Sequence, residues 1–182
     1  NNKVVNYITD LYAIEDFTLS SVKKSIKING LRQINVSPLE GCILRVLLQI
    51  HQSKKVVEVG TLAAYSTIWI ARSLPLNGVV YSFEKDEMVA NIARENIKNS
   101  DVADKIKIIS GDAHANLKAI ENEGAFDAIF IDAEKTGYIK YLEWADKNIR
   151  KGGLIIADNT LQAGDITKTE FDDKRKEKTI NA

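Results

Sequence analysis

The chain has 182 residues, and its 25 basic and 25 acidic side chains give a formal net charge of zero. A neutral chain has no overall attraction for nucleic acid or for an anionic membrane, so we expect a small molecule as its partner. No apolar run approaches the roughly 18 residues of a membrane span, no signal peptide is visible, and the single cysteine, Cys42, fits a reducing compartment, so we expect a cytoplasmic protein.

Residues 1–182, of which 45% are apolar, are expected to form a single domain with a hydrophobic core. Residues 1–50 are predicted to be helical. Within them, Ser37, Pro38 and Glu40 mark a helix start, with serine as the N-cap, proline in the first helical position and glutamate three residues after the cap.

From residue 54 to about 160, short apolar strands alternate with helices. Strands are predicted at residues 56–59, 79–83, 106–109, 125–131 and 154–157. Helices are predicted at 67–74, 86–99, 114–122 and 138–149, with Gly152-Gly153 ending the last one. This alternation predicts βαβ units, and hence a doubly wound, mostly parallel α/β sheet with helices on both faces. Residues 161–182 are charged and are expected to be a solvated segment.

A glycine or a carboxylate stands at the end of every predicted strand. These residues are Gly60, Glu84, Asp112, Asp132 and Asp158. Ligands of parallel sheets bind outside the carboxyl ends of the strands. Folding alone requires polar turns there but not carboxylates, so we predict a functional site at this edge.

Gly60 and Glu84 predict a site for a nucleoside-containing cofactor. Gly60 would allow a sharp turn, and the helix after it would offer free N–H groups to a carboxylate or phosphate. The stretch is not G-x-G-x-x-G, which disfavours an NAD-dependent oxidoreductase. Glu84 could accept hydrogen bonds from ribose hydroxyls, although a surface glutamate in a turn explains it about as well. Asp112 could contact an adenine amino group or simply cap a helix.

Asp132 and the pair Asp158-Asn159 predict a cation site. Two carboxylates and an amide are oxygen ligands that suit Mg²⁺ or Ca²⁺ and do not suit a closed zinc site. Helix or turn caps are the alternative interpretation, but two strands that end in this way favour a metal. Lys135, three residues after Asp132, suggests deprotonation of a small hydroxylated substrate beside the cation.

In this order and spacing, the motifs resemble those of the cation-dependent small-molecule O-methyltransferases, which include catechol and caffeoyl-CoA O-methyltransferases. The resemblance covers roughly residues 35–164. It rests on Val56–Thr61, Tyr65-Ser66, Phe83-Glu84, Gly111–Ala113, Ile131–Lys135, Tyr138, Tyr141, Gly152-Gly153 and Ala157–Asn159. It implies a Rossmann-like S-adenosylmethionine (SAM) methyltransferase fold, SAM as cofactor, Mg²⁺ or another divalent cation, a catechol-like acceptor and a homodimer.

The resemblance also implies a role for each site residue. Lys135 would take the proton from the acceptor hydroxyl, and a cation beside that oxygen would stabilise the oxyanion. The cation would be bound by Asp132, Asp158 and Asn159. SAM would contact Asn35, Val36, Glu58, Gly60, Tyr65, Ser66, Glu84, Asp112, Ala113 and Asp132.

The chain departs from this family at several positions. Ala64 replaces a usual glycine and would narrow the cleft at a helix N-terminus, although we favour a tolerated small residue. Gly137 stands where asparagine is common, and Gln162 where many relatives carry an aromatic residue. Relatives continue with two further strands, whereas no strand-like run follows here, so we expect the C-terminal strands to be missing and the chain to be incomplete. The alternative function is therefore a non-catalytic SAM-binding protein of this fold.

Overall fold

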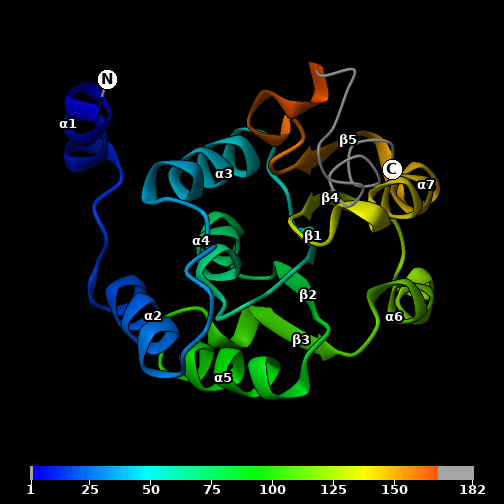
Figure 1. The fold of residues 1–182 in the computed structure, drawn as a ribbon. Coiled ribbons are helices and arrows are strands. Elements are labelled where there is room, and N and C mark those ends of the chain that lie inside the picture. The colour runs from blue at the N-terminus through cyan, green and yellow to red at the C-terminus, as the bar shows by residue number, and fades with distance from the viewer. Residues whose placement is uncertain (1, 168–182) are drawn as a thin grey trace.

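The computed structural model describes residues 2–167 of the chain. Its strands form one parallel sheet in the order β3-β2-β1-β4-β5 (Figure 1). The strands are β1 (Lys55–Val59), β2 (Val79–Glu84), β3 (Ile106–Ser110), β4 (Phe126–Ile131) and β5 (Ile149–Ala157). The predicted doubly wound sheet is therefore confirmed, and its strand order reverses between β1 and β4.

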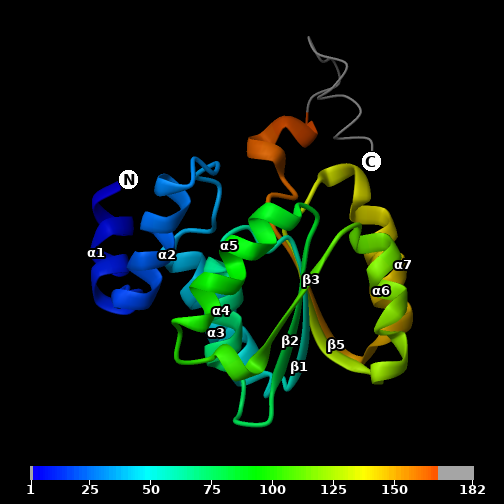
Figure 2. The ribbon, with the colours of Figure 1, turned by 90° about the horizontal axis from the view of Figure 1, so that it is seen from below.

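Helices cover both faces of this sheet (Figure 2). On one face lie α3 (Pro38–Ile50), α4 (Tyr65–Ser73) and α5 (Glu87–Lys98), and on the other α6 (Ala113–Ala119) and α7 (Tyr138–Asn148). The N-terminal helices α1 (Asn2–Tyr12) and α2 (Phe17–Ile28) form an outer layer, in which α1 contacts α3 while α2 contacts α4 and α5. Short 3-10 helices complete the described chain: η1 (Ala103–Lys105), η2 (Glu121–Glu123), η3 (Lys135–Gly137) and η4 (Gln162–Thr167).

The predicted charged segment is described only as far as Thr167. Residues 168–182 lie outside the described residues, and the predicted lack of C-terminal strands falls on them. The helix start predicted at Ser37, Pro38 and Glu40 is confirmed. Ser37 Oγ accepts the backbone N–H of Glu40 at 3.3 Å, and the Glu40 carboxylate accepts that of Ser37 at 2.6 Å. Asp86 caps α5 by accepting the N–H of Met88 at 2.8 Å.

The glycine pair Gly152-Gly153 does not end a helix, contrary to our prediction. Helix α7 already ends at Asn148, and β5 begins at the next residue, so both glycines lie inside a strand. The ladder between β4 and β5 has an irregularity at this point. A Cβ on Gly153 would lie 2.7 Å from the carbonyl oxygen of Asp127, so the strands approach too closely there for a side chain.

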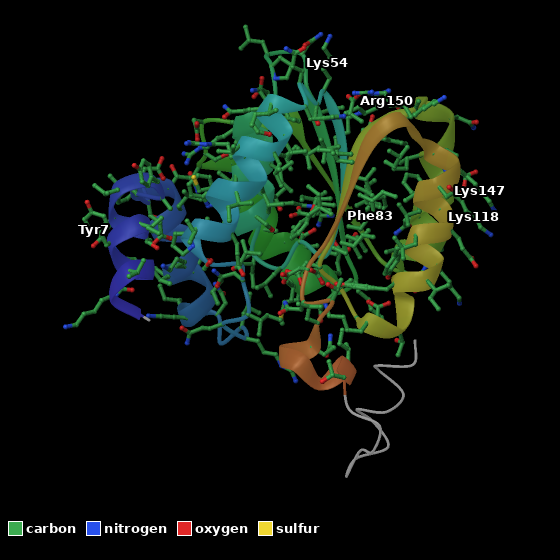
Figure 3. All side chains as sticks on the ribbon, turned by 90° about the horizontal axis from the view of Figure 1, so that it is seen from above. Tyr7, Lys54, Phe83, Lys118, Lys147 and Arg150 are labelled. Atoms are coloured by element: carbon green, nitrogen blue, oxygen red, sulfur yellow. The ribbon has the colours of Figure 1, made fainter. Side chains whose placement is uncertain are left out.

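Backbone hydrogen bonds continue the sheet ladder one residue beyond the strands. The N–H groups of Gly60, Asp132 and Asp158 each donate to a carbonyl at the end of a neighbouring strand, at 2.9 to 3.0 Å. These bonds hold the residues that follow β1, β4 and β5 in register at the carboxyl edge of the sheet. Lys54 and Arg150 lie at the opposite edge, far from η4 (Figure 3).

Ala64, the residue just before α4, has a left-handed backbone with φ at +71°. Its methyl group is fully buried and packs with Ala93 and Ile97 of α5. An L-residue in this conformation costs on the order of 1–2 kcal/mol, whereas glycine adopts it without strain. The alanine therefore stores strain at a position where the family that the chain resembles usually has glycine.

We expect Ala64→Gly to destabilise the chain less than Ala93→Gly does. Both variants lose a fully buried methyl group, but Ala93 lies inside α5, so only the change at position 64 relieves a left-handed strain. The two losses in the free energy of unfolding, measured by urea denaturation, should differ by about 1 kcal/mol or more. Equal losses would show that the backbone at Ala64 is unstrained.

Candidate functional site

A cavity of about 430 Å³ lies at the carboxyl edge of the sheet, where the strand order reverses. Most of the residues predicted to contact the cofactor line it: Asn35, Val36, Gly60, Tyr65, Ser66, Glu84, Asp112, Ala113 and Asp132. Ala64 is not among the lining residues, so its methyl group does not narrow this cavity. Phe83, near the carboxyl end of β2, also lines the cavity, and its side chain is buried inside the molecule (Figure 3).

Three residues that no motif predicted also line the cavity. They are Arg32, Ile34 and Lys85. All three lie in loops, where a charged or single apolar residue looks like ordinary surface. For Lys85, its place directly after Glu84 was the one signal that could have indicated this position.

Gly60 brings the loop after β1 against the end of β4. Its φ is +102°, and a Cβ there would overlap the carbonyl oxygen of Asp132, so only glycine fits. Helix α4 begins five residues later at Tyr65, and no side chain caps its N-terminus. The free N–H groups of its first turn are therefore available to an anionic group in the cavity.

Glu84 fixes the geometry of the same loop. Its carboxylate accepts the backbone N–H of Leu62 at 2.9 Å and that of Asp86 at 3.1 Å. A carboxylate has about four acceptor positions, so it can accept further hydrogen bonds from a ligand. Asp112 lines the cavity and also caps α6, where it accepts the N–H of Ala115 at 3.0 Å, so the predicted helix cap is confirmed and the contact with adenine stays a prediction.

Glu58 does not line the cavity. It is fully buried in β1, where one carboxylate oxygen accepts hydrogen bonds from Thr67 Oγ1 at 2.5 Å and from Ser82 Oγ at 2.6 Å. The other oxygen has no partner among the described residues. Burial raises the pKa of Glu58 to about 7, against the lowering effect of these hydrogen bonds. The side chain thus joins β1, β2 and α4, whose ends form the cavity wall.

Asp132 and Asp158 follow neighbouring strands, and their carboxylates are close enough to interact; Asp132 lines the cavity, whereas Asp158 is not among its lining residues. Burial, and next the negative charge of Asp158, raise the pKa of Asp132 to about 6. The side-chain amide of Asn159 donates to the Asp158 carboxylate. Two carboxylates that repel each other favour a cation between them, and their oxygens suit a hard divalent ion.

Within residues 2–167, no group of three or more His, Cys, Asp or Glu side chains could hold a metal ion. A cation beside Asp132 and Asp158 would therefore also need the amide oxygen of Asn159 and oxygens from water or substrate. Such an open ligand set is typical of a catalytic metal rather than of a closed structural site. The donor atoms present thus fit a divalent cation.

Lys135 begins η3, next to this pair of carboxylates. Its Nζ donates to the carbonyl oxygen of Asp158 at 2.9 Å and to the hydroxyl of Tyr138. Burial lowers the pKa of Lys135, although the negative charges of Asp132 and Asp158 oppose this shift. A lysine with a lowered pKa is better suited to accept a proton near neutral pH.

Comparison with known proteins decides the family. A family model described as O-methyltransferase matches residues 9–181. The chain belongs to this O-methyltransferase family. A catechol O-methyltransferase from Niastella koreensis is 42% identical over 165 residues, which are 90% of this chain and 75% of that protein. A catechol O-methyltransferase from Mycobacterium tuberculosis is 37% identical over 143 residues, which are 79% of this chain and 64% of that protein.

A solved structure agrees with this assignment. The O-methyltransferase from Bacillus cereus in complex with SAH is 38% identical, with a TM-score of 0.91, and the match covers 98% of this chain and 82% of that one. The predicted fold and the predicted enzyme class, a SAM-dependent O-methyltransferase, are confirmed at the level of the family. In the described part of the chain, no helix has the length and apolar character needed to cross a membrane.

We expect Glu58 to make the folded O-methyltransferase less stable as the pH rises from about 4.5 to about 7. Because its pKa is higher in the folded chain than in the unfolded one, the folded chain binds this proton more tightly in that window and loses the advantage as the pH rises. The free energy of unfolding of the wild type, minus that of Glu58→Gln, should fall by up to about 1.4 kcal/mol per pH unit.

The pKa of Asp132 is also raised, so this residue changes the stability over the same pH range. Because Asp132 is present in both proteins, its contribution cancels when the variant is subtracted from the wild type. Urea denaturation at a series of pH values, with EDTA present throughout, gives the two curves. Parallel curves for the wild type and Glu58→Gln would show that the pKa of Glu58 is not raised.

Proposed function

We propose that this chain transfers a methyl group from SAM to a hydroxyl of a small, catechol-like acceptor, with the assistance of a divalent cation. The observation that carries the proposal is that two predicted subsites adjoin at one sheet edge. The cavity beside Gly60 and Glu84 meets the corner formed by Asp132, Asp158 and Asn159, and Asp132 belongs to both. Methyl transfer requires cofactor and acceptor to be held in contact, and this arrangement would provide that.

The charge of the cavity supports SAM as the cofactor. Four carboxylates and two cationic side chains line it: Glu84, Asp112, Asp132, Glu134, Arg32 and Lys85. An excess of negative charge attracts the sulfonium cation of SAM and disfavours the pyrophosphate of a dinucleotide. This charge balance, together with the missing glycine fingerprint, argues against an NAD-dependent oxidoreductase.

The parts of SAM would be divided among the elements around the cavity. Glu84 would accept hydrogen bonds from the ribose hydroxyls, and Asp112 would lie beside the adenine. The methionine end would meet the Gly60 loop and the uncapped start of α4, where Ser66 lines the cavity. Glu58 would support this loop from inside the sheet rather than by contact. The Bacillus cereus relative, solved with SAH, supports this use of the fold.

Asp132, Asp158 and Asn159 would hold Mg²⁺ or a similar hard cation. When bound, the cation would supply Lewis acidity that stabilises the oxyanion of the acceptor. An acceptor with two adjacent hydroxyls could fill the open coordination positions with its own oxygens. The names of the two relatives, both catechol O-methyltransferases, support an acceptor of this kind.

Lys135 would take the proton from the acceptor hydroxyl. Its amine, whose pKa burial lowers, is held at the carbonyl of Asp158. The acceptor oxygen would then form a bond to the methyl carbon while the carbon–sulfur bond breaks, and the electron pair would remain on the sulfur of SAH. Much of the acceleration would come from holding the two reactants in line at the shared edge.

The proposal is tested by methyl transfer from SAM to catechol, with Mg²⁺ present or removed by EDTA. We expect turnover with Mg²⁺, its loss in EDTA and its recovery when Mg²⁺ is restored, because the cation would stabilise the oxyanion of the acceptor. Calorimetric SAM binding should persist in EDTA. Full turnover in EDTA would contradict the role of the cation, and no SAM binding under either condition would favour the non-catalytic alternative.

A further inference from the structure

Tyr138 is the centre of a small hydrogen-bond network at the ends of β4 and β5. It is the first residue of α7 and is half-buried, directly after the short helix η3 that carries Lys135. Its hydroxyl oxygen lies 3.1 Å from the carbonyl oxygen of Ile131 and 3.0 Å from that of Asp158. The Nζ of Lys135 donates a hydrogen bond to the same hydroxyl.

The directions of these hydrogen bonds follow from the proton of the hydroxyl. A backbone carbonyl can only accept, and the hydroxyl donates its single proton toward the carbonyl of Ile131 or that of Asp158. The hydroxyl oxygen then presents only lone pairs to Lys135. In this pair of side chains the lysine is the donor, and a neutral amine can keep this direction because it still has two N–H groups.

Lys135 makes a second donation, to the Asp158 carbonyl oxygen at 2.9 Å. A neutral amine has two N–H groups and one lone pair in a tetrahedral arrangement. When Tyr138 and the Asp158 carbonyl accept both N–H groups, the lone pair must take the remaining direction. Among the described residues, no other group forms a hydrogen bond with this Nζ. The same two contacts can be kept after the amine takes up a proton, because the new N–H takes the place of the lone pair.

We propose that Tyr138 is a positioning residue that fixes the orientation of the Lys135 amine for proton transfer. The inference rests on the proposed role of Lys135 as the base. A lysine side chain is long and flexible, and one acceptor would still let the amine rotate about that hydrogen bond. Two acceptors on a rigid strand end and helix start define where the lone pair points, which is the geometric requirement for general base catalysis.

Tyr138→Phe tests this inference because it removes the hydroxyl and keeps the ring, whose centre lies 4.3 Å from the Lys135 Nζ. With SAM, catechol and Mg²⁺, we expect kcat to fall about tenfold and the KM for SAM to stay unchanged, as for the loss of one oriented hydrogen bond. Lys135→Ala should lower kcat further. The double variant should be no slower than Lys135→Ala alone, because Tyr138 would act only through Lys135.

Tyr81→Phe is the matched control. Tyr81 is a buried tyrosine in β2 whose hydroxyl donates to Glu123 at 3.0 Å and has no contact with Lys135. This variant should retain the wild-type kcat. A crystal structure of Tyr138→Phe should show the Nζ of Lys135 displaced from the Asp158 carbonyl or spread over several positions, whereas Tyr81→Phe should leave it in place.

The inference is overturned if Tyr138→Phe retains full kcat, if the double variant is much slower than Lys135→Ala, or if Nζ stays in place in the Tyr138→Phe structure. A different result would contradict the proposed function instead, namely an inactive wild type or full activity in Lys135→Ala. In that case the position of Nζ in the crystal structure of the variant still decides whether Tyr138 orients the amine.

Discussion

The close approach of the Gly60 backbone to the carbonyl of Asp132 is the contact on which the rest of the site depends. It joins the ends of β1 and β4 at the point where the strand order reverses, and it leaves no room for a Cβ. Because the loop after Gly60 stays close to the sheet, Glu84 can bind the N–H of Leu62 and α4 can start at the cavity. The proposed SAM and cation subsites both border this contact.

Negative charge gathers at this edge beyond what folding requires. Burial, and next the negative charge of Asp158, raise the pKa of Asp132. Behind the cavity wall, the carboxyl of Glu58 is buried in the sheet, and one of its oxygens has no partner among the described residues. Such features cost stability in the free chain and are typical of functional sites, and the repulsion between the carboxylates of Asp132 and Asp158 favours a cationic partner. Here the sulfonium of SAM and a divalent cation would both be such partners, with Lys135 as the basic group at the carbonyl of Asp158.

Much of this architecture could be predicted from the sequence, because parallel strands bring every strand end to one edge. Strand-end residues such as Glu84 and Asp132 therefore sufficed to place the cavity. The buried position of Glu58 depends on which face of β1 its side chain takes, and an isolated sequence does not reveal this. The prediction that Gly152 ends a helix was wrong because β5 follows α7 directly, without a loop that needs a glycine. The network around Tyr138 arises from packing between two strand ends, for which no spacing rule exists.

The central claim is that one sheet edge holds two separable subsites, one for SAM and one for the cation. It is tested most directly by measuring SAM affinity by calorimetry and Mg²⁺-dependent methyl transfer in Asp158→Ala and in Glu84→Ala. We predict that Asp158→Ala abolishes Mg²⁺-dependent turnover with nearly unchanged SAM affinity, and that Glu84→Ala weakens SAM binding about tenfold or more, because hydrogen bonds to a carboxylate are lost. Equal losses of SAM affinity in both variants would contradict the account.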